Sequence, residues 1–239
     1  MKTSSVLITE TIEALNSLAN HERKELAKTY YPTKMKVIGV INPDVKIVVK
    51  QLKLDIKLFN PKQIIQLTKD LVHTDIFECQ QVGYEIIGKD KNLLPYLSLQ
   101  DVEQLDHNQD NWVSVDTFSS YILGVAWRLG IVTDLEILNK TESSNFWIRR
   151  QALVATLGWN QKARGGIGNT GKTLMICLKL MDDHHDMINK ALSWALRELT
   201  KTDRNSVIDF MEKFDERLHG RVRREVWNKI NTGLKNPVL

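Results

Sequence analysis

The sequence predicts an all-α fold in which short helices stack in pairs along the chain. Apolar residues recur at helical spacing through most of the 239 residues, and capping residues or prolines stand before most of these runs. The one strand-like stretch is Met35–Ile41, which lies between helical runs, so we expect an extended connection there and not a sheet.

In the first half of the chain, each apolar-periodic run follows residues suited to begin a helix. Ser4 or Ser5 precedes the first run, and Asn42-Pro43 and Asn60-Pro61 each combine a capping side chain with a proline for the first helical position. Thr74 and Ser98 stand before two more runs. We therefore expect helices that include Val6–Leu18, Val45–Leu52, Ile64–Leu71, Ile76–Ile86 and Leu99–Leu105.

The second half continues in the same way. Trp112 to Gly130 is one long candidate helix that ends at a glycine. Further runs follow Asn145, Thr170 or Thr173, Asp186 and Asp203, and the last helix begins near Glu216. Helices of about 10–18 residues with short loops are typical of HEAT-like repeats, an α-solenoid whose helix pairs recur about every 40 residues. A compact bundle is the alternative architecture.

Composition places the chain among ordinary globular proteins. Hydrophobic residues make up 42% and charged residues 26%, which excludes a disordered or fibrous chain. We expect a single domain over residues 1–239. Cys79 and Cys177 are too few for a disulfide framework or a four-thiolate zinc site, so we expect two buried thiols. Without a secretory signal or an 18-residue apolar stretch, the sequence predicts a cytoplasmic protein with no transmembrane helix.

Charge is distributed unevenly along the chain. Ser143–Met181 contains no acidic residue but carries Arg149, Arg150, Lys162, Arg164, Lys172 and Lys179, whereas Asp101–Glu136 holds seven acids and one base, Arg128. A basic central segment suits an anionic partner such as nucleic acid. A solvated basic face without a partner is the alternative interpretation.

Two motifs suggest chemistry that their context does not support. Gly166–Thr173 matches the Walker A pattern, but no strand precedes it, so we expect a basic loop whose Arg164 and Lys172 contact DNA phosphates. Asp182–Asp186 crowds metal-ligand side chains together, yet adjacent helical residues point to different sides and no distant ligand completes a site. We expect a polar turn there, with Asp186 as a helix cap.

Three segments combine tryptophan with charge at helical spacing. Trp112 and Asp116 stand at i and i+4, and Trp147 and Arg150 at i and i+3 within Phe146-Trp147-Ile148-Arg149-Arg150. Trp194 and Arg197 stand at i and i+3 within Lys190–Glu198. A single tryptophan is usually a packing residue, but three such pairs in a helical chain with a basic segment favour a functional groove.

At these segments the sequence resembles the DNA alkylation repair family, the AlkD-like HEAT-repeat DNA glycosylases. The resemblance extends from about Leu15 to Lys235, and its most specific markers are Phe146–Ala152 and Lys190–Glu198. It implies a superhelix whose concave basic face holds double-stranded DNA with alkylated bases, and the excision of N3- and N7-alkylated purines as free bases. It implies no metal or cofactor, and we expect a monomer that is nucleoid-associated when bound to DNA.

The resemblance also assigns roles to individual residues. Asp116 matches the catalytic aspartate, Trp112 and Trp194 match the aromatic pair that lines the lesion site, and Arg150 matches the arginine on the DNA backbone. Trp147, Arg149 and Arg197 match further motif residues.

The sequence departs from the family pattern in two places. Asn111 and Val113 stand where better-known members often have a second tryptophan and an acidic residue, and the spacer between Arg150 and Trp194 is longer. Some relatives bind unusual DNA without excising bases, so a non-catalytic binder of damaged or branched DNA is the alternative function. The third possible function is that of a HEAT-like protein-interaction scaffold.

Overall fold

The computed structural model describes residues 2–237 and confirms the all-α class. Within that range the only extended pairing is an isolated bridge between Lys36 and Ile76. The chain divides into two compact units, Met1–Ile122 and Leu123–Leu239. Among residues 2–237, none of the helices combines the length and the hydrophobicity that a membrane span requires.

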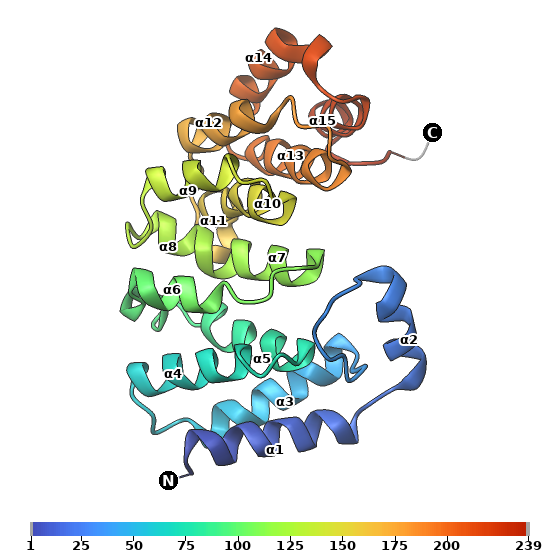
Figure 1. Cartoon of the computed structure of the whole chain (residues 1–239). Helices are drawn as coiled ribbons and strands as arrows, with labels where there is room; N and C mark the ends of the chain where they lie inside the picture. The colour runs from blue at the N-terminus through green and yellow to red at the C-terminus, as the bar shows by residue number, and fades with distance from the viewer. Residues whose placement is uncertain (1, 238–239) are drawn as a thin grey trace. The chain divides into compact units, whose positions relative to one another are not determined.

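The first unit is built around one central helix. Helix α5 (Phe77–Gly88) packs against α3 (Asn42–Asp55), α4 (Pro61–Val72) and α7 (Trp112–Phe118). Figure 1 shows α1 (Ser4–Ser17) beside α3, whereas α2 (His21–Tyr30) stands apart from this pair. Helix α6 (Leu99–Leu105) follows a short 3-10 turn and packs on α4.

A network around one buried acid fixes the segment that the sequence predicts as an extended connection. Both carboxylate oxygens of Glu78 accept backbone N–H groups, from Ile38 at 2.9 Å, Gly39 at 2.8 Å and Val40 at 3.2 Å. Glu78 is fully buried. The carboxylate therefore accepts the hydrogen bonds that the carbonyl groups of a neighbouring strand would accept in a sheet.

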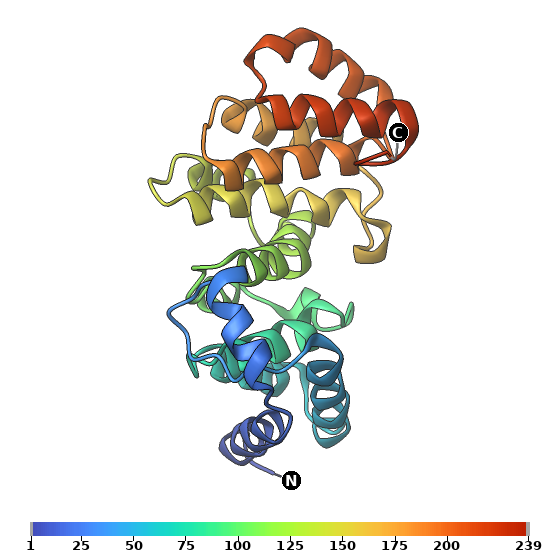
Figure 2. The ribbon, with the colours of Figure 1, turned by 90° about the vertical axis from the view of Figure 1, so that its right-hand side faces the viewer.

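In the second unit α13 (Asp186–Leu199) is the central helix. It packs against α10 (Phe146–Ala155), α12 (Thr170–Leu180) and α15 (Gly220–Thr232). In Figure 2 α13 runs between α10 and α15, so its apolar face is covered on both sides. Helices α8 (Gly124–Arg128), α9 (Asp134–Thr141), α11 (Leu157–Asn160) and α14 (Arg204–Phe214) complete the unit.

Two glycines allow α8 and α11 to pack closely. A Cβ on Gly124 would lie 2.1 Å from the carbonyl oxygen of Ala155, and one on Gly158 would lie 2.3 Å from the carbonyl carbon of Gly124. Neither separation is possible for real atoms, so the backbones meet only because both residues lack a side chain.

Many predicted boundaries are confirmed by side-chain caps. Asn60, Ser98, Asn145 and Asp203 each accept a backbone N–H at the start of a helix. Other boundaries were wrong by one or more residues: Ile41, not Asn42, is the N-cap of α3, and His185, not Asp186, caps α13. The last helix begins at Gly220, because the residues near Glu216 form a 3-10 turn, Asp215–Arg217.

The predicted long helix from Trp112 is continuous but not uniform. After α7, Ser119–Leu123 forms a π-helical turn, and α8 then runs to Arg128. Gly130 follows in the left-handed conformation with φ of 77°, as expected for a glycine that ends a helix.

Both cysteines are buried free thiols, as predicted. Burial raises the pKa of the Cys79 thiol to about 11 and that of Cys177 still further. A continuous solenoid and a single domain over the whole chain stay predictions.

Candidate functional site

Helix α7 begins with a side-chain network around Asn111. The Asn111 Oδ1 accepts the Ser114 N–H at 3.0 Å and its amide nitrogen donates to the Ser114 hydroxyl at 2.9 Å. That hydroxyl donates in turn to Gln80 Oε1 at 2.5 Å, which ties the start of α7 to α5. Asn111 is therefore a buried cap at this departure from the family pattern.

Trp112 is the first residue of α7, and its indole is held by the end of α2. The indole N–H donates to the carbonyl oxygen of Tyr30 at 2.8 Å. The two rings meet edge to face, with centroids 5.3 Å apart and an interplanar angle of 88°. These contacts fix the orientation of an indole that is only partly buried.

Asp116 lies one turn after Trp112, so both side chains leave the same side of α7. Asp116 is half-buried, neither sealed in the core nor fully exposed. The Ser120 hydroxyl donates to the backbone carbonyl of Asp116 at 2.6 Å, at the start of the π-helical turn. π-helical turns inside helices are frequent at functional sites.

Helix α10 carries Trp147, Arg149 and Arg150 in one turn. The Arg149 Nε donates to Asp183 Oδ2 at 2.7 Å, and its Nη1 donates to the Ser143 carbonyl at 2.8 Å. Arg150 is 5% exposed, and its Nη1 donates to the carbonyl of Met187. Arg149 therefore ties α10 to the turn before α13, and Arg150 ties it to the first turn of α13.

An aromatic stack accompanies these arginines. Trp147 lies 4.6 Å from Phe146 between ring centroids, and Phe146 stacks on His185 at 3.9 Å. The His185 Nδ1 also accepts the Met187 N–H at 3.2 Å as the cap of α13. Phe146 thus links α10 to the N-cap of α13, and Trp147 packs on Phe146 and remains partly exposed.

Helix α13 carries Trp194, which is half-buried, and Arg197. The Arg197 Nε donates to Ser193 Oγ at 3.1 Å and lies 3.9 Å from Glu225 Oε2. Glu225 is buried and also accepts the Ser193 hydroxyl at 2.6 Å. Burial lowers the pKa of the Arg197 guanidinium, and the charge of Glu225 opposes that shift. Arg197 therefore joins α13 to α15.

The glycine-rich loop is built as a helix connection. A 3-10 turn, Lys162–Arg164, precedes it, and the Gly166 and Gly168 N–H groups donate to Gln161 at 3.0 Å and Trp159 at 2.9 Å. Asn169 then caps α12, which begins at Thr170 as one of the two predicted positions. Helix α11 and the 3-10 turn precede the loop, so the strand that a Walker A loop requires does not stand before it in this part of the chain.

Arg164 and Lys172, the two residues predicted to contact DNA phosphates, have different surroundings. The Lys172 ammonium pairs with Asp134 and lies 5.8 Å from the ring centroid of Trp127. The backbone carbonyl of Arg164 accepts from Arg128 Nη2 at 2.8 Å, and the Arg164 side chain is half-buried. Lys172 is therefore held by an ion pair within the second unit.

The acidic turn before α13 is a structural turn, as the sequence predicts. Asp182 pairs with Arg217, Asp183 with Arg149, and Asp186 with Lys190 at 2.7 Å. No group of three or more His, Cys, Asp or Glu side chains that could hold a metal ion occurs among residues 2–237.

Tyr30 is the site residue that the sequence did not indicate. It ends α2, a helix with few apolar residues and therefore no clear periodicity. The available sequence signal for this helix was Asn20, because asparagine is a preferred N-cap residue. In the structure its side chain accepts the Arg23 N–H at 2.9 Å.

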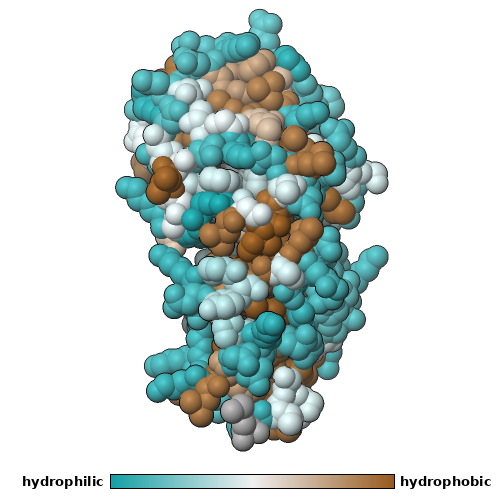
Figure 3. Space-filling view, turned by 90° about the vertical axis from the view of Figure 1, so that its left-hand side faces the viewer, coloured by the Kyte–Doolittle hydropathy of each residue, from teal (hydrophilic) through white to brown (hydrophobic). Residues whose placement is uncertain are grey.

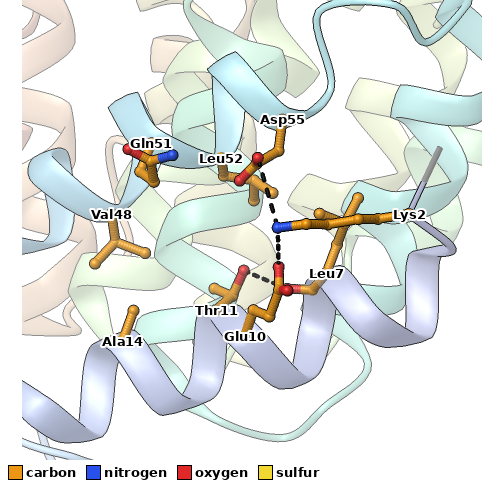
Figure 4. A pocket seen from close by; sticks show the side chains of 9 residues that line it. All are labelled: Lys2, Leu7, Glu10, Thr11, Ala14, Val48, Gln51, Leu52 and Asp55. Carbon is orange, nitrogen blue, oxygen red and sulfur yellow. Dashed lines mark hydrogen bonds and ion pairs between the residues drawn. The ribbon is translucent and has the colours of Figure 1, made fainter.

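The cavity between α1 and α3 is not a candidate site. It measures about 180 Å³. Figure 4 shows its charged residues paired with each other, with the Lys2 ammonium 2.7 Å from Glu10 and 3.6 Å from Asp55.

Comparison with known proteins gives two findings that agree. A model of the family described as DNA alkylation repair enzyme matches residues 11–230. A solved structure, a predicted DNA alkylation repair enzyme from Enterococcus faecalis, is similar with a TM-score of 0.68 and 20% identity, over 90% of this chain and 97% of that chain. No match was found among curated proteins. The match over most of the chain shows that this protein belongs to the DNA alkylation repair enzyme family.

Proposed function

We propose that this protein is a DNA glycosylase that excises N3- and N7-alkylated purines from duplex DNA. Family membership supports a role in alkylation repair. The observation that carries the finer proposal is the placement of Trp112 and Asp116 one turn apart on α7, with the indole fixed by Tyr30. An oriented aromatic face beside a half-buried carboxylate suits a cationic base and its sugar.

Asp116 is the proposed catalytic residue. Alkylation at N3 or N7 gives the purine a positive charge, so the bond between C1′ and the base nitrogen breaks with its electron pair leaving on the base. The sugar then develops oxocarbenium character, which a nearby carboxylate stabilises. Water adds to C1′, and Asp116 positions it or accepts its proton. No metal or cofactor takes part in these steps.

Trp112 and Trp194 are proposed to contact the lesion. The face of an indole attracts a cation by about 0.5–2 kcal/mol, depending on how well water is excluded. Before the bond breaks, only the alkylated purine carries a positive charge, so this attraction selects the damaged base and not the normal one. Both indoles are partly exposed and available for such contacts.

The basic residues divide into two proposed groups. Arg150 is proposed to contact the DNA backbone, as the family resemblance implies, and the Met187 carbonyl helps to fix its position. Arg149, Arg197 and Lys172 are proposed to act as positioning residues, because each is paired with an acid of the second unit. Arg164 and Trp147 are proposed as further DNA contacts. The same proposal includes a concave basic face that holds duplex DNA, a monomeric state, and a cytoplasmic, nucleoid-associated location.

The test is base release from methylated duplex DNA by the purified protein. We expect release of 3-methyladenine or 7-methylguanine, and a loss of about 10²–10⁴-fold in rate for Asp116→Asn with DNA affinity nearly unchanged. Asp209→Asn, an exposed position on α14, is the matched control. DNA binding without any base release by the wild-type protein would favour the non-catalytic alternative.

A further inference from the structure

The end of α2 and the start of α7 are joined at two places. At the first, the Trp112 indole N–H donates to the Tyr30 carbonyl at 2.8 Å. At the second, the Asp110 carboxylate accepts the Thr33 hydroxyl and the Lys34 N–H, both at 2.6 Å. Figure 1 shows the two helix ends beside each other. The two connections close a ring through the backbone of both segments.

The segments between the two contacts are short. On the α7 side a single residue separates Asp110 from Trp112. On the α2 side Pro32 is one of the two residues between Tyr30 and Thr33, and its ring restricts the backbone of that segment. Two contacts joined in this way support each other, because making one brings the atoms of the other together. Without the carboxylate, one hydrogen bond and apolar packing would be left to orient the indole.

The Asp110 carboxylate is engaged at both oxygens. Oδ1 accepts the Thr33 hydroxyl and also the amide N–H of Asn111 at 3.2 Å, and Oδ2 accepts the Lys34 N–H. The Thr33 hydroxyl in turn accepts the Met35 N–H at 3.1 Å. Hydrogen bonds to an ionised acceptor are short and about twice as strong as neutral ones. One carboxylate therefore binds the residues that follow α2 to the start of α7.

We propose that Asp110 is a positioning residue for Trp112. This inference rests on the proposed function, in which the Trp112 indole contacts the cationic purine. By binding the segment after α2, Asp110 fixes the Tyr30 carbonyl to which the indole donates. An aromatic face that is already held in place meets the lesion without first losing its rotational freedom. Asp110 acts through the indole and does not itself contact the base.

Hydrogen bonding and charge make different demands on this residue. Asp110→Asn keeps an oxygen for the Lys34 N–H and gives an amide N–H₂ to the Thr33 hydroxyl, which accepts as well as donates. It loses the charge and the 3.2 Å bond from Asn111. Asp110→Ala loses both contacts with the α2 side. Positioning by hydrogen bonds therefore requires that Asp110→Asn behaves like the wild-type protein and that Asp110→Ala does not.

The test follows the Trp112 indole by ¹⁹F NMR of the full protein labelled with fluorotryptophan, with its signal assigned from Trp112→Phe. At a temperature where all variants are folded, we expect Asp110→Ala to shift or broaden that signal and Asp110→Asn to leave it in place. The value of kcat/KM for release of 3-methyladenine from methylated duplex should fall about 3–30-fold in Asp110→Ala, since a displaced indole loses at most its attraction for the cation. Asp110→Asn should keep the wild-type value.

Asp101 provides a matched structural control in the same unit. It too accepts a backbone N–H at the start of a helix, from Ser98 at 3.0 Å, and it pairs with Lys69 at 2.7 Å. Asp101→Ala should lower the unfolding temperature, as Asp110→Ala does, because both remove a carboxylate that binds two segments together. The control should leave the Trp112 signal and kcat/KM unchanged, which a general loss of stability would not explain in reverse.

Thr33→Val is the second variant. It removes the hydroxyl that donates to Asp110 at 2.6 Å but keeps the side-chain shape, the carboxylate and the Lys34 bond. We expect it to displace the Trp112 signal in the same direction as Asp110→Ala and by a smaller amount. If Asp110→Ala does not fold, this variant decides the outcome.

The outcomes separate this inference from the proposed function. A wild-type protein that releases no base overturns the glycosylase proposal, whereas the ¹⁹F signal of Trp112 reports on Asp110 with or without base release. An unchanged signal in Asp110→Ala, or in Thr33→Val if the alanine variant does not fold, overturns the inference. Equal losses in Asp110→Asn and Asp110→Ala also overturn it, because the charge would then be what matters. A displaced indole with undiminished kcat/KM overturns the link between its position and base release.

Discussion

Replacing Glu78 with glutamine tests whether one buried carboxylate holds the connection between α2 and α3. The acid is fully buried and accepts three consecutive backbone N–H groups at 2.8–3.2 Å. One oxygen serves Gly39 and Val40, and the other serves Ile38. Glutamine has almost the same shape but places an amide nitrogen where one of these oxygens was.

The expected loss follows from the geometry. The better of the two orientations keeps the oxygen that serves Gly39 and Val40 and turns an N–H₂ donor toward the Ile38 N–H. A hydrogen bond to a charged group contributes about 1.5–3 kcal/mol, and a buried donor left without an acceptor costs about 1–3 kcal/mol. Because the two remaining bonds also lose their charge assistance, we expect Glu78→Gln to lower the free energy of unfolding by about 3–5 kcal/mol.

Urea unfolding followed by circular dichroism measures the loss, with Glu103→Gln, at an exposed position of α6, as the control. Limited trypsin digestion provides a local readout, since Lys34 and Lys36 lie beside the connection. We expect faster cleavage there in the variant. A loss of less than 1 kcal/mol with unchanged cleavage would refute the reasoning, because it would mean that the three hydrogen bonds contribute little to stability.

Three further predictions concern other parts of the fold. The ion pair with Lys172 lowers the pKa of Asp134 below its usual value of 3.8. Above pH 3.8 the wild-type protein should therefore unfold at a higher urea concentration than Asp134→Asn. This difference in urea midpoint should disappear as the pH falls through the lowered pKa of Asp134. Gly124→Ala should cost several kcal/mol by overpacking, whereas Gly220→Ala, where a Cβ meets nothing within 4 Å, should be neutral in thermal unfolding. Cys79, with its pKa raised to about 11, should react with a maleimide at neutral pH only after denaturation.

The sequence predicts the fold well wherever a helix has an apolar stripe and a polar cap. Asn60 and Ser98 form complete capping boxes, with their partner side chains reciprocating three residues later. Helix α2 was missed because His21–Tyr30 has one buried residue, Ala27, and so shows no stripe. Its role depends on Tyr30 meeting Trp112 across 82 positions of sequence, which no local pattern encodes.

The same reasoning explains why charge was the weakest guide to the candidate site. The stretch Ser143–Met181 contains no acidic residue, which predicts an exposed basic surface. Yet Arg149 pairs with an acid 34 positions later, and Lys172 with one 38 positions earlier. Each partner acid lies on or beside a different helix from the base that it pairs with. The fold therefore neutralises basic residues that have no acid near them in sequence.

The ion pairs of Arg149 and Lys172 affect how strongly DNA affinity should depend on salt. A cation already paired with a buried or half-buried acid adds little attraction for phosphate, since its field is cancelled at short range. If Arg149 and Lys172 only position helices, replacing either with glutamine should weaken folding more than it changes the salt dependence of DNA affinity. The separate proposal that Arg150 contacts a phosphate predicts that Arg150→Gln reduces the slope of log affinity against log salt by about 1, the release of roughly one counterion. The proposed assignment of Arg150 to a phosphate would be wrong if that slope did not change.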